Sequence, residues 1–418
     1  MTKDFIDFLK LYSYGIVDRE CEQFEFDIDS VCKIARNQDA SGIIYYAINR
    51  LYGNKFENNE TYKACNRIFL MEYVSSVKKR NALLLVLKKL NEKGIKYRVL
   101  KGVCLGSLYP EPAIRKSVDV DILADREFIS PIVDELKGMG FVAEQERDDT
   151  HHICCFNPVA GSFEVHHMLY DECFDEAWFE SKFSPIEDTL FVDIDGVSVP
   201  TLGVTDGLIF DFLHLIKHFL LTGTTVQQIS DILLYIKKYK DQICWERANK
   251  LFAELRYDIF FYGLLTIGRR YMNFNESDLP DFVENVNSAN CILYDLETGG
   301  AYGHLQRKER DKFYHRYTKD RFDAEKKGIS YEKYIAEKKH ITIIDKIFSR
   351  KSKLEQKYIF LKKHSWLLPV AWILRWIDGA KRIAVGKVKV KEYARIMPNS
   401  DNEVINERMK IVNELNML

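Results

Sequence analysis

The chain has 418 residues, enough for two or three domains of ordinary size. Hydrophobic residues make up 46% of it and charged residues 29%, as is usual in a soluble globular protein. No apolar run approaches the ~20 residues of a membrane span, and the N-terminus lacks the pattern of a signal peptide, so we expect a cytoplasmic protein. The nine cysteines include no Cys-x-x-Cys pair, and we expect reduced thiols.

The net charge of −1 is unevenly distributed along the chain. Residues 301–418 contain 28 Lys and Arg against 15 Asp and Glu, a net charge of +13, so the rest carries −14. Such an asymmetry suits internal docking or a solvated face, and it also suits a polyanionic partner such as a nucleic acid. Because the bases are interspersed with acids, we favour the first two alternatives over nucleic-acid binding.

Residues 1–93 are predicted to be helical. Apolar residues recur at three- and four-residue spacing over residues 4–12, 30–52 and 62–91. Gly94 suits the position just after the last of these helices. We expect this region to support or cover the domain that follows it.

Residues 95–124 are predicted to form a strand, a glycine turn, a short helix, a loop and a second strand. The first strand, over residues 97–100, runs directly into Lys101-Gly102, and we therefore place the turn there. Gly106-Ser107 is an alternative turn, which this interpretation places inside the short helix over residues 103–109. Pro110 ends that helix, and residues 118–123 form the second strand.

Asp119 and Asp121 are two apart in the second strand, so their side chains share one face of the sheet. Two carboxylates this close repel each other, and a divalent metal ion removes the penalty. Mg²⁺ prefers carboxylates together with phosphate oxygens. The flanking apolar residues argue against a solvated turn, so we predict a metal site here.

Further strands are expected downstream. Ser130 is predicted to cap a helix over residues 131–137, and a strand begins at Phe141. Residues 151–156 and 163–169 are predicted to form one hairpin, and residues 191–200, interrupted at Asp195-Gly196, a second. A two-metal site needs a third carboxylate on a neighbouring strand, and Glu164 is the candidate. The alternative for Glu164 is an ion pair at the rim of the sheet.

These residues resemble a bacterial family of uncharacterised nucleotidyltransferases, within the superfamily that has the DNA polymerase β-like fold. The resemblance rests on Leu100-Lys101-Gly102, Tyr109-Pro110, Arg115 and Asp119-Val120-Asp121. It extends to an acid-hydrophobic-His strand, matched by Glu164-Val165-His166, and to a histidine-containing helix, matched by Lys217-His218-Phe219. The family also has an aspartate on the following helix and a Trp-Leu-Leu-Pro segment, which are matched by Asp231 and residues 366–369. Lys101 and Arg115 are candidates for phosphate contact, as a point charge and a bidentate fork, and Gly102 lets backbone N–H groups approach a phosphate. The alternative for Arg115 is a surface role.

Asp211, His214 and His218 follow helical spacing in the segment after the second hairpin. His214-x-x-x-His218 is also a zinc-type spacing, but no third ligand is evident. If this helix and the next pack antiparallel, His218 comes near Asp231, which would favour a cationic His218 able to meet a phosphate. The alternative is a buried His-Asp hydrogen bond that only joins the helices.

Two further groups of residues suggest chemistry less strongly. His151-His152 and Cys154-Cys155 contain metal-binding side chains, but adjacent residues on a strand point to opposite faces, which argues against shared ligation. Tyr317, Trp366, Trp372 and Trp376 lie among basic residues and could stack on bases, although spacing of this kind more often belongs to a core.

We therefore predict an α+β protein with a polymerase-β-like mixed sheet embedded in helical N- and C-terminal parts. The expected regions are a helical part (1–93), the nucleotidyltransferase domain (94–200), a helical part completing the cleft (201–300) and a basic helical part (301–418). The predicted activity is transfer of an NMP from an NTP to a small molecule, a sugar or lipid intermediate or a protein side chain. Asp119, Asp121 and Glu164 would hold two Mg²⁺ ions, while Lys101, Gly102, Arg115, His218 and Asp231 would bind the nucleotide. The alternatives are a non-catalytic nucleotide-binding protein and an RNA-modifying enzyme.

Overall fold

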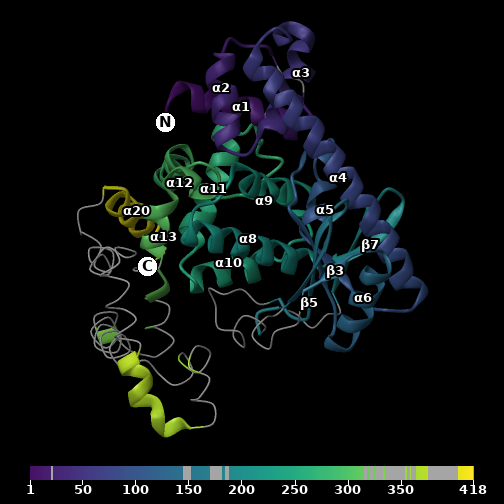
Figure 1. Ribbon diagram of the computed structural model, residues 1–418. Helices are drawn as coiled ribbons and strands as arrows, with labels where there is room; N and C mark the ends of the chain where they lie inside the picture. Colours follow the sequence, from purple (N-terminus) through teal and green to yellow (C-terminus); the bar gives the residue numbers. More distant parts are fainter. Residues whose placement is uncertain are drawn as a thin grey trace. The chain divides into compact units, whose positions relative to one another are not determined.

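The computed structural model (Figure 1) has two compact units, Met1–Asp311 with Glu407–Leu418, and Lys312–Asn406. It describes residues 1–19, 22–144, 152–169, 181–183, 188–314, 318–320, 324, 333–334, 354, 358, 364–374 and 403–417. Among these residues, no helix is both long enough and apolar enough to cross a bilayer.

The N-terminal region is helical, as predicted. Its elements are α1 (Lys3–Ile16), α2 (Ile28–Asn37), α3 (Ser41–Tyr52), the 3₁₀ turn η1 (Gly53–Phe56) and α4 (Glu60–Glu92). The apolar pattern over residues 30–52 belongs to two helices, because Asp39 takes a left-handed φ of 54° between them. α4 begins where the Asn59 side chain accepts a hydrogen bond from the Tyr62 N–H, and Gly94 follows its end with a φ of 65°, as expected.

A five-stranded mixed sheet follows α4. Its order is β1 (Arg98–Leu100), β2 (Asp119–Leu123), β5 (Gly161–His166), β4 (His152–Asn157) and β3 (Val142–Ala143). The pair β2–β5 is parallel and the other pairs are antiparallel. This mixed sheet confirms the predicted α+β class.

One face of the sheet packs on α4 and on α6 (Arg126–Gly138), which lie beside it in Figure 1. The buried core there includes Leu83, Leu87, Val120, Ile122, Ile132, Leu136, Phe163 and Val165. Because strand side chains alternate, the residues between these apolar ones point to the other face. The second face therefore carries the polar side chains of β2 and β5.

α6 corrects one prediction. The helix begins at Arg126, with Asp125 at the N-cap, so Ser130 is not a cap and Pro131 lies inside the helix. Proline removes one backbone hydrogen bond there. Ile129, two residues before the predicted start at Pro131, is buried in the core, and its packing favours a helix that begins before the proline.

A two-stranded hairpin and a set of helices complete the larger unit. β6 (Thr189–Ile194) and β7 (Val197–Leu202) are joined by Asp195 and Gly196 with φ values of 53° and 80°, which confirms the predicted turn. The helices that follow are α8 (Val204–Leu221), α9 (Val226–Tyr239), α10 (Trp245–Glu254), α11 (Asp258–Tyr271) and α12 (Val286–Gly299). α10 and α11 are separate helices, divided near Arg256, whose φ is 61°.

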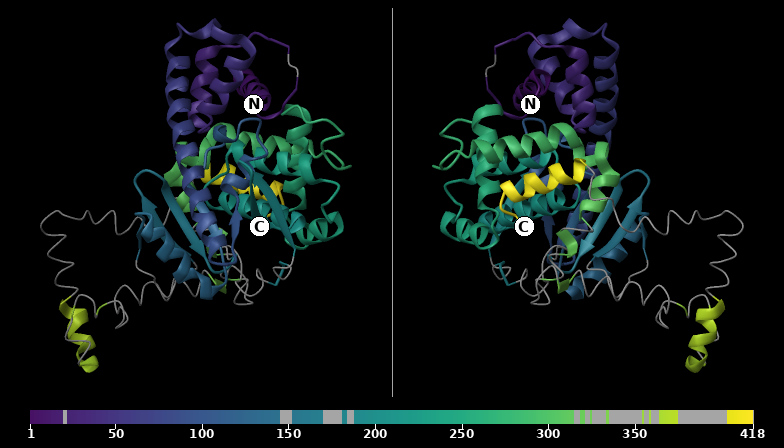
Figure 2. Two further views of the ribbon diagram at one scale, coloured as in Figure 1. Left: turned by 90° about the vertical axis from the view of Figure 1, so that its right-hand side faces the viewer. Right: turned by 90° about the vertical axis from the view of Figure 1, so that its left-hand side faces the viewer.

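The last described elements are η3 (Ala301–Gln306), α13 (Arg307–Phe313), η5 (Ser365–Leu367) and α20 (Glu403–Glu414). In both views of Figure 2 the yellow helix α20 lies against the helices of the larger unit, and Glu407 and Glu414 accept hydrogen bonds from Tyr294 and Cys291 of α12. Within the smaller unit, Trp372 packs on a cluster that contains Leu354, Tyr358 and Ala371, whereas Trp366 is exposed. Tyr317 and Trp376 lie outside the described residues.

Candidate active site

A cleft of about 660 Å³ opens on the face of the sheet that α4 and α6 leave uncovered. Its lining includes the eight residues to which the sequence assigned a catalytic, metal-binding or nucleotide-binding role: Lys101, Gly102, Arg115, Asp119, Asp121, Glu164, His218 and Asp231. A volume of this size is within the range of sites for small ligands. Residues from the sheet, α8 and α9 therefore surround one shared space.

Three carboxylates converge at the sheet side of the cleft. Asp119 and Asp121 point from β2 to the uncovered face, and Glu164 is the register partner of Asp121 on the parallel strand β5. Ligand atoms of Asp121, Glu164 and His166 all lie within 4.8 Å of one another. Parallel strands and a two-residue period thus bring acids 43 to 45 positions apart onto one patch.

His166 joins two of these acids. Its Nε2 lies 3.0 Å from Asp121 Oδ1 and 3.4 Å from Glu164 Oε2. Burial works against protonation of the ring, but the two carboxylates raise the pKa of His166. The hydrogen bond from His166 lowers the pKa of Glu164, and against the effect of burial Lys101 and His166 lower the pKa of Asp121.

Asp119 behaves differently from its neighbours. Burial, followed by the charges of Asp121 and Glu164, raises the pKa of Asp119. Its ionised form is therefore poorly compensated by the protein alone. A divalent cation would supply the missing charge, and carboxylate oxygens are the donors that such cations prefer, so the residues present fit a metal ion.

The turn at the edge of this patch is strained. Lys101 has φ 46° and ψ −129°, a conformation that costs a residue other than glycine about 1–3 kcal/mol. Gly102, with φ 34°, begins the short helix α5 (Gly102–Gly106). The preferred turn is confirmed, and Gly106 lies in the helix as expected. The Lys101 ammonium lies 3.1 Å from His214 Nδ1 and 4.7 Å from the ring centre of Phe210.

Arg115 and Asp231 form a buried ion pair. Arg115 Nε and Nη2 each lie 2.8 Å from one carboxylate oxygen of Asp231, and Arg115 Nη1 donates to the Gly102 carbonyl at 3.1 Å. The Tyr109 hydroxyl also donates to Asp231, at 2.8 Å. The pairing that the structure shows at Asp231 is thus with Arg115 and Tyr109, and Arg115 supports the glycine turn from behind.

His218 contacts its neighbour on α8. Its Nε2 lies 2.9 Å from Nε2 of His214, and its ring centre is 5.2 Å from that of Tyr302. Burial, with Lys101 and Lys217 nearby, lowers the pKa of His214 well below its usual range. A neutral His214 therefore links Lys101 to His218 along the wall of the cleft.

Comparison with known proteins agrees with this geometry. Residues 25–273, more than half of the chain, match the profile of a family described as uncharacterised nucleotidyltransferase. The chain belongs to this family. It is a nucleotidyltransferase with a mixed sheet and an α+β fold. No curated protein matches its sequence.

Solved structures similar to this nucleotidyltransferase share little sequence with it. The antibiotic-resistance factor ANT(2'')-Ia is 14% identical, over 43% of this chain and 92% of its own, with a TM-score of 0.33. The lincosamide antibiotic adenylyltransferase LnuA is 15% identical, over 37% and 93%, with a TM-score of 0.26. An antigenic nucleotidyltransferase-like protein from Paracoccidioides brasiliensis is 17% identical, over 43% and 90%, with a TM-score of 0.30.

Lys79 supports the loop that leads into β2 of this nucleotidyltransferase, a role that was not predicted from the sequence. Its buried ammonium donates from α4 to the carbonyls of Ser117 and Val118, directly before β2. Burial lowers the pKa of Lys79, and the charge of Asp119 opposes that effect. A signal was present, since Lys79 is one turn before Leu83 on the apolar stripe of α4.

Proposed function

We propose that this nucleotidyltransferase moves a nucleoside monophosphate from an NTP to an acceptor hydroxyl or phosphate in a Mg²⁺-dependent reaction. The observation that carries the proposal is the convergence of Asp119, Asp121 and Glu164 on one face of the sheet, within a cleft that also contains Lys101. An ion-pair network on the surface needs no open cavity. A phosphoryl-transfer site needs a cavity of this kind, because it must admit two substrates.

The three acids would hold two Mg²⁺ ions, which would supply positive charge to offset the negative charge that develops during transfer. The Lys101 ammonium, which lies beside His214 and Phe210, would contact the triphosphate as a point charge. Gly102 allows close approach of the backbone beside it. Arg115 and Asp231 act indirectly in this proposal, since their buried pair holds Gly102 in place.

The reaction forms one bond and breaks one. The acceptor oxygen attacks the α-phosphorus, the bond from that phosphorus to the bridging oxygen breaks, and pyrophosphate leaves. Because the pKa of Glu164 is lowered, its carboxylate is ionised and can accept the proton of an acceptor hydroxyl. The acceptor classes to test are small molecules, sugar or lipid intermediates, and protein side chains.

A panel of the four NTPs, with and without Mg²⁺ and with candidate acceptors, tests the proposal through pyrophosphate release and the mass of the product. We expect metal-dependent gain of one NMP by an acceptor. Asp119→Asn with Asp121→Asn should abolish transfer while the protein stays folded, whereas the exposed Asp125→Asn should not. Unchanged transfer by the double variant would refute the assignment, and salt-sensitive addition of NMP to RNA would favour the RNA-modifying alternative.

A further inference from the structure

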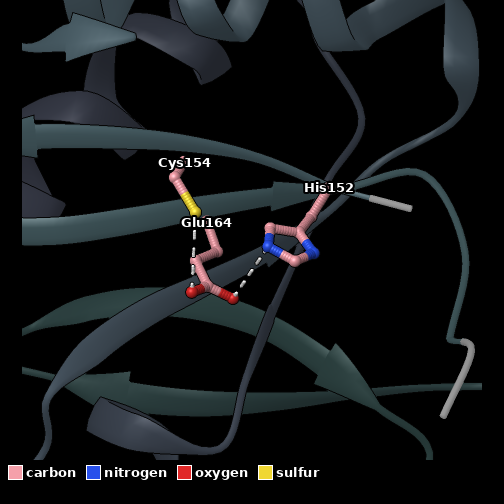
Figure 3. Close-up of side chains that lie close together, drawn as sticks. All are labelled: His152, Cys154 and Glu164. Carbon is pink, nitrogen blue, oxygen red and sulfur yellow. Dashed lines mark hydrogen bonds and ion pairs between the residues drawn. The ribbon is translucent and has the colours of Figure 1, made fainter. Parts of the chain in front are cut away.

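The hairpin of β4 and β5 brings three kinds of metal-binding side chain together. His152 and Cys154 are two apart on β4 and share a face, and Glu164 is the register partner of Cys154 on β5. In Figure 3 the thiol of Cys154 and the imidazole of His152 both point at the carboxylate of Glu164. Adjacent strand residues point to opposite faces and cannot easily bind the same ion, but His152 and Cys154 are two apart and can.

The separations suit one ion. Cys154 Sγ lies 3.8 Å from Glu164 Oε1, and His152 Nε2 lies 3.8 Å from Glu164 Oε2. All three ligand atoms lie within 4.8 Å of one another. Ligands of a tetrahedral zinc ion are roughly 3.3–3.8 Å apart, because each is 2.0–2.3 Å from the metal. The side chains of His152 and Glu164 are 25% and 24% exposed, so solvent and ions have access.

We propose that His152, Cys154 and Glu164 form a binding site for Zn²⁺ or a similar borderline-soft ion, beside the carboxylate site and sharing Glu164 with it. Thiolate and imidazole select zinc, whereas Mg²⁺ selects oxygen donors. The oxygen-rich group of Asp119 and Asp121 and this sulfur-containing group thus prefer different metals. Three protein ligands leave a fourth position for water or a substrate atom.

A second arrangement competes with this one. Asp121, Glu164 and His166 also have ligand atoms within 4.8 Å of one another, so an ion bound to Glu164 could lie on that side. Only the site proposed here contains sulfur. Thiolate ligation therefore separates the two arrangements.

Glu164 couples the zinc site to the reaction. Its Oε1 faces Cys154, and its Oε2 faces His152 and also His166, which contacts Asp121. An ion bound at Cys154 would also bind the carboxylate of Glu164, which the site with Asp119 and Asp121 shares. Zinc should therefore inhibit transfer; this consequence rests on the proposed function, but the binding site itself does not.

The test is a Co²⁺ titration of the reduced, full-length protein without nucleotide, followed by Zn²⁺ displacement. We expect a thiolate-to-cobalt charge-transfer band that zinc removes. Cys154→Ser should abolish the band and weaken zinc binding at least about tenfold. The exposed Cys244→Ser is the matched control and should keep both properties.

Further variants make the result decisive. Asp119→Asn should keep zinc binding, since Asp119 is not a ligand of this site, and His152→Gln should weaken it as Cys154→Ser does. Thermal unfolding without metal checks that each variant folds, and Cys154→Ala replaces the serine variant if that one does not. Absence of the charge-transfer band in the parent protein, or zinc binding by Cys154→Ser as tight as in the parent, would overturn the proposal. Binding lost in Asp121→Asn but kept in Cys154→Ser would overturn it as well, by placing the ion beside His166.

Discussion

The ammonium nitrogen of Lys101 lies 3.1 Å from Nδ1 of His214, and this contact fixes which nitrogen of the ring carries its proton. An ammonium group can only donate, so Nδ1 accepts and the proton of neutral His214 is on Nε2. That nitrogen faces Nε2 of His218 at 2.9 Å and donates to it. The orientation of His218 therefore depends on Lys101, through the ring of His214.

Lys101→Met should remove the cation at the turn while keeping a side chain of similar length. We expect kcat/KM to fall about 10²–10³-fold, the usual effect of deleting one group that stabilises charge in the transition state. Exposed Lys238→Met is the control and should leave the rate unchanged. Steady-state kinetics at saturating metal provides the measurement, and a loss below about threefold would exclude a phosphate contact.

Asp231→Ala should destabilise the fold, because it leaves the buried guanidinium of Arg115 without its carboxylate. Loss of one partner of a buried pair costs roughly 3–5 kcal/mol in the free energy of unfolding. The double variant, Arg115→Met with Asp231→Leu, should lose less free energy of unfolding than the sum of the losses in its two single variants. Urea unfolding tests both statements. Weakened NTP binding without loss of stability would instead support direct nucleotide contact.

His218→Gln should weaken NTP binding or turnover with little change in stability, because His218 lines the cleft beside Tyr302. Isothermal titration with a non-hydrolysable NTP measures the binding. A purely structural role predicts the reverse pattern: normal binding, with a loss of roughly 1–3 kcal/mol from an imperfectly satisfied buried partner.

Asp211 should make stability depend on pH. Burial, partly offset by Lys101, raises the pKa of Asp211 to about 7, whereas an unfolded aspartate has a pKa near 3.9. The native state holds this proton more tightly, so the contribution is fully present below about pH 4 and is lost as the pH rises through 7. We expect Asp211→Asn to gain roughly 2–4 kcal/mol relative to the parent between about pH 4 and pH 8. Denaturant unfolding of the parent and of Asp211→Asn across this pH range measures the difference, and the surface variant Asp241→Asn is the control. Equal pH dependence of the two free energies of unfolding would show that Asp211 titrates normally.

Local patterns were sufficient to predict β2 and the direction of its acidic side chains. Asp119 and Asp121 alternate with apolar Val120 and Ile122, and this alternation alone assigns the acids to the face opposite the core. Glu164 follows from the same rule, since it lies between buried residues of β5. Strand periodicity is a property of neighbouring residues and needs no knowledge of distant contacts.

The partners of Arg115 could not be predicted in this way. Arg115 and Asp231 are 116 positions apart, and their contact exists only because α9 packs against the loop before β2. Lys79, from α4, reaches the same loop over 38 positions. The start of α6 was wrong for a related reason, because burial of Ile129 against the sheet outweighs the local effect of Pro131.

The carboxylate of Asp295 receives Arg310 from α13 and Arg408 from α20, and all three side chains are almost fully buried. Arg310 lies just before the unit Lys312–Asn406 and Arg408 just after it. Asp295 therefore binds the chain on both sides of this unit. In the chain the smaller unit is thus an insertion between two segments of the larger unit, and we expect that a flexible linker can replace it. A protein with residues 312–406 replaced by such a linker should fold and unfold cooperatively, whereas Asp295→Ala in the full chain should release α20 to limited proteolysis.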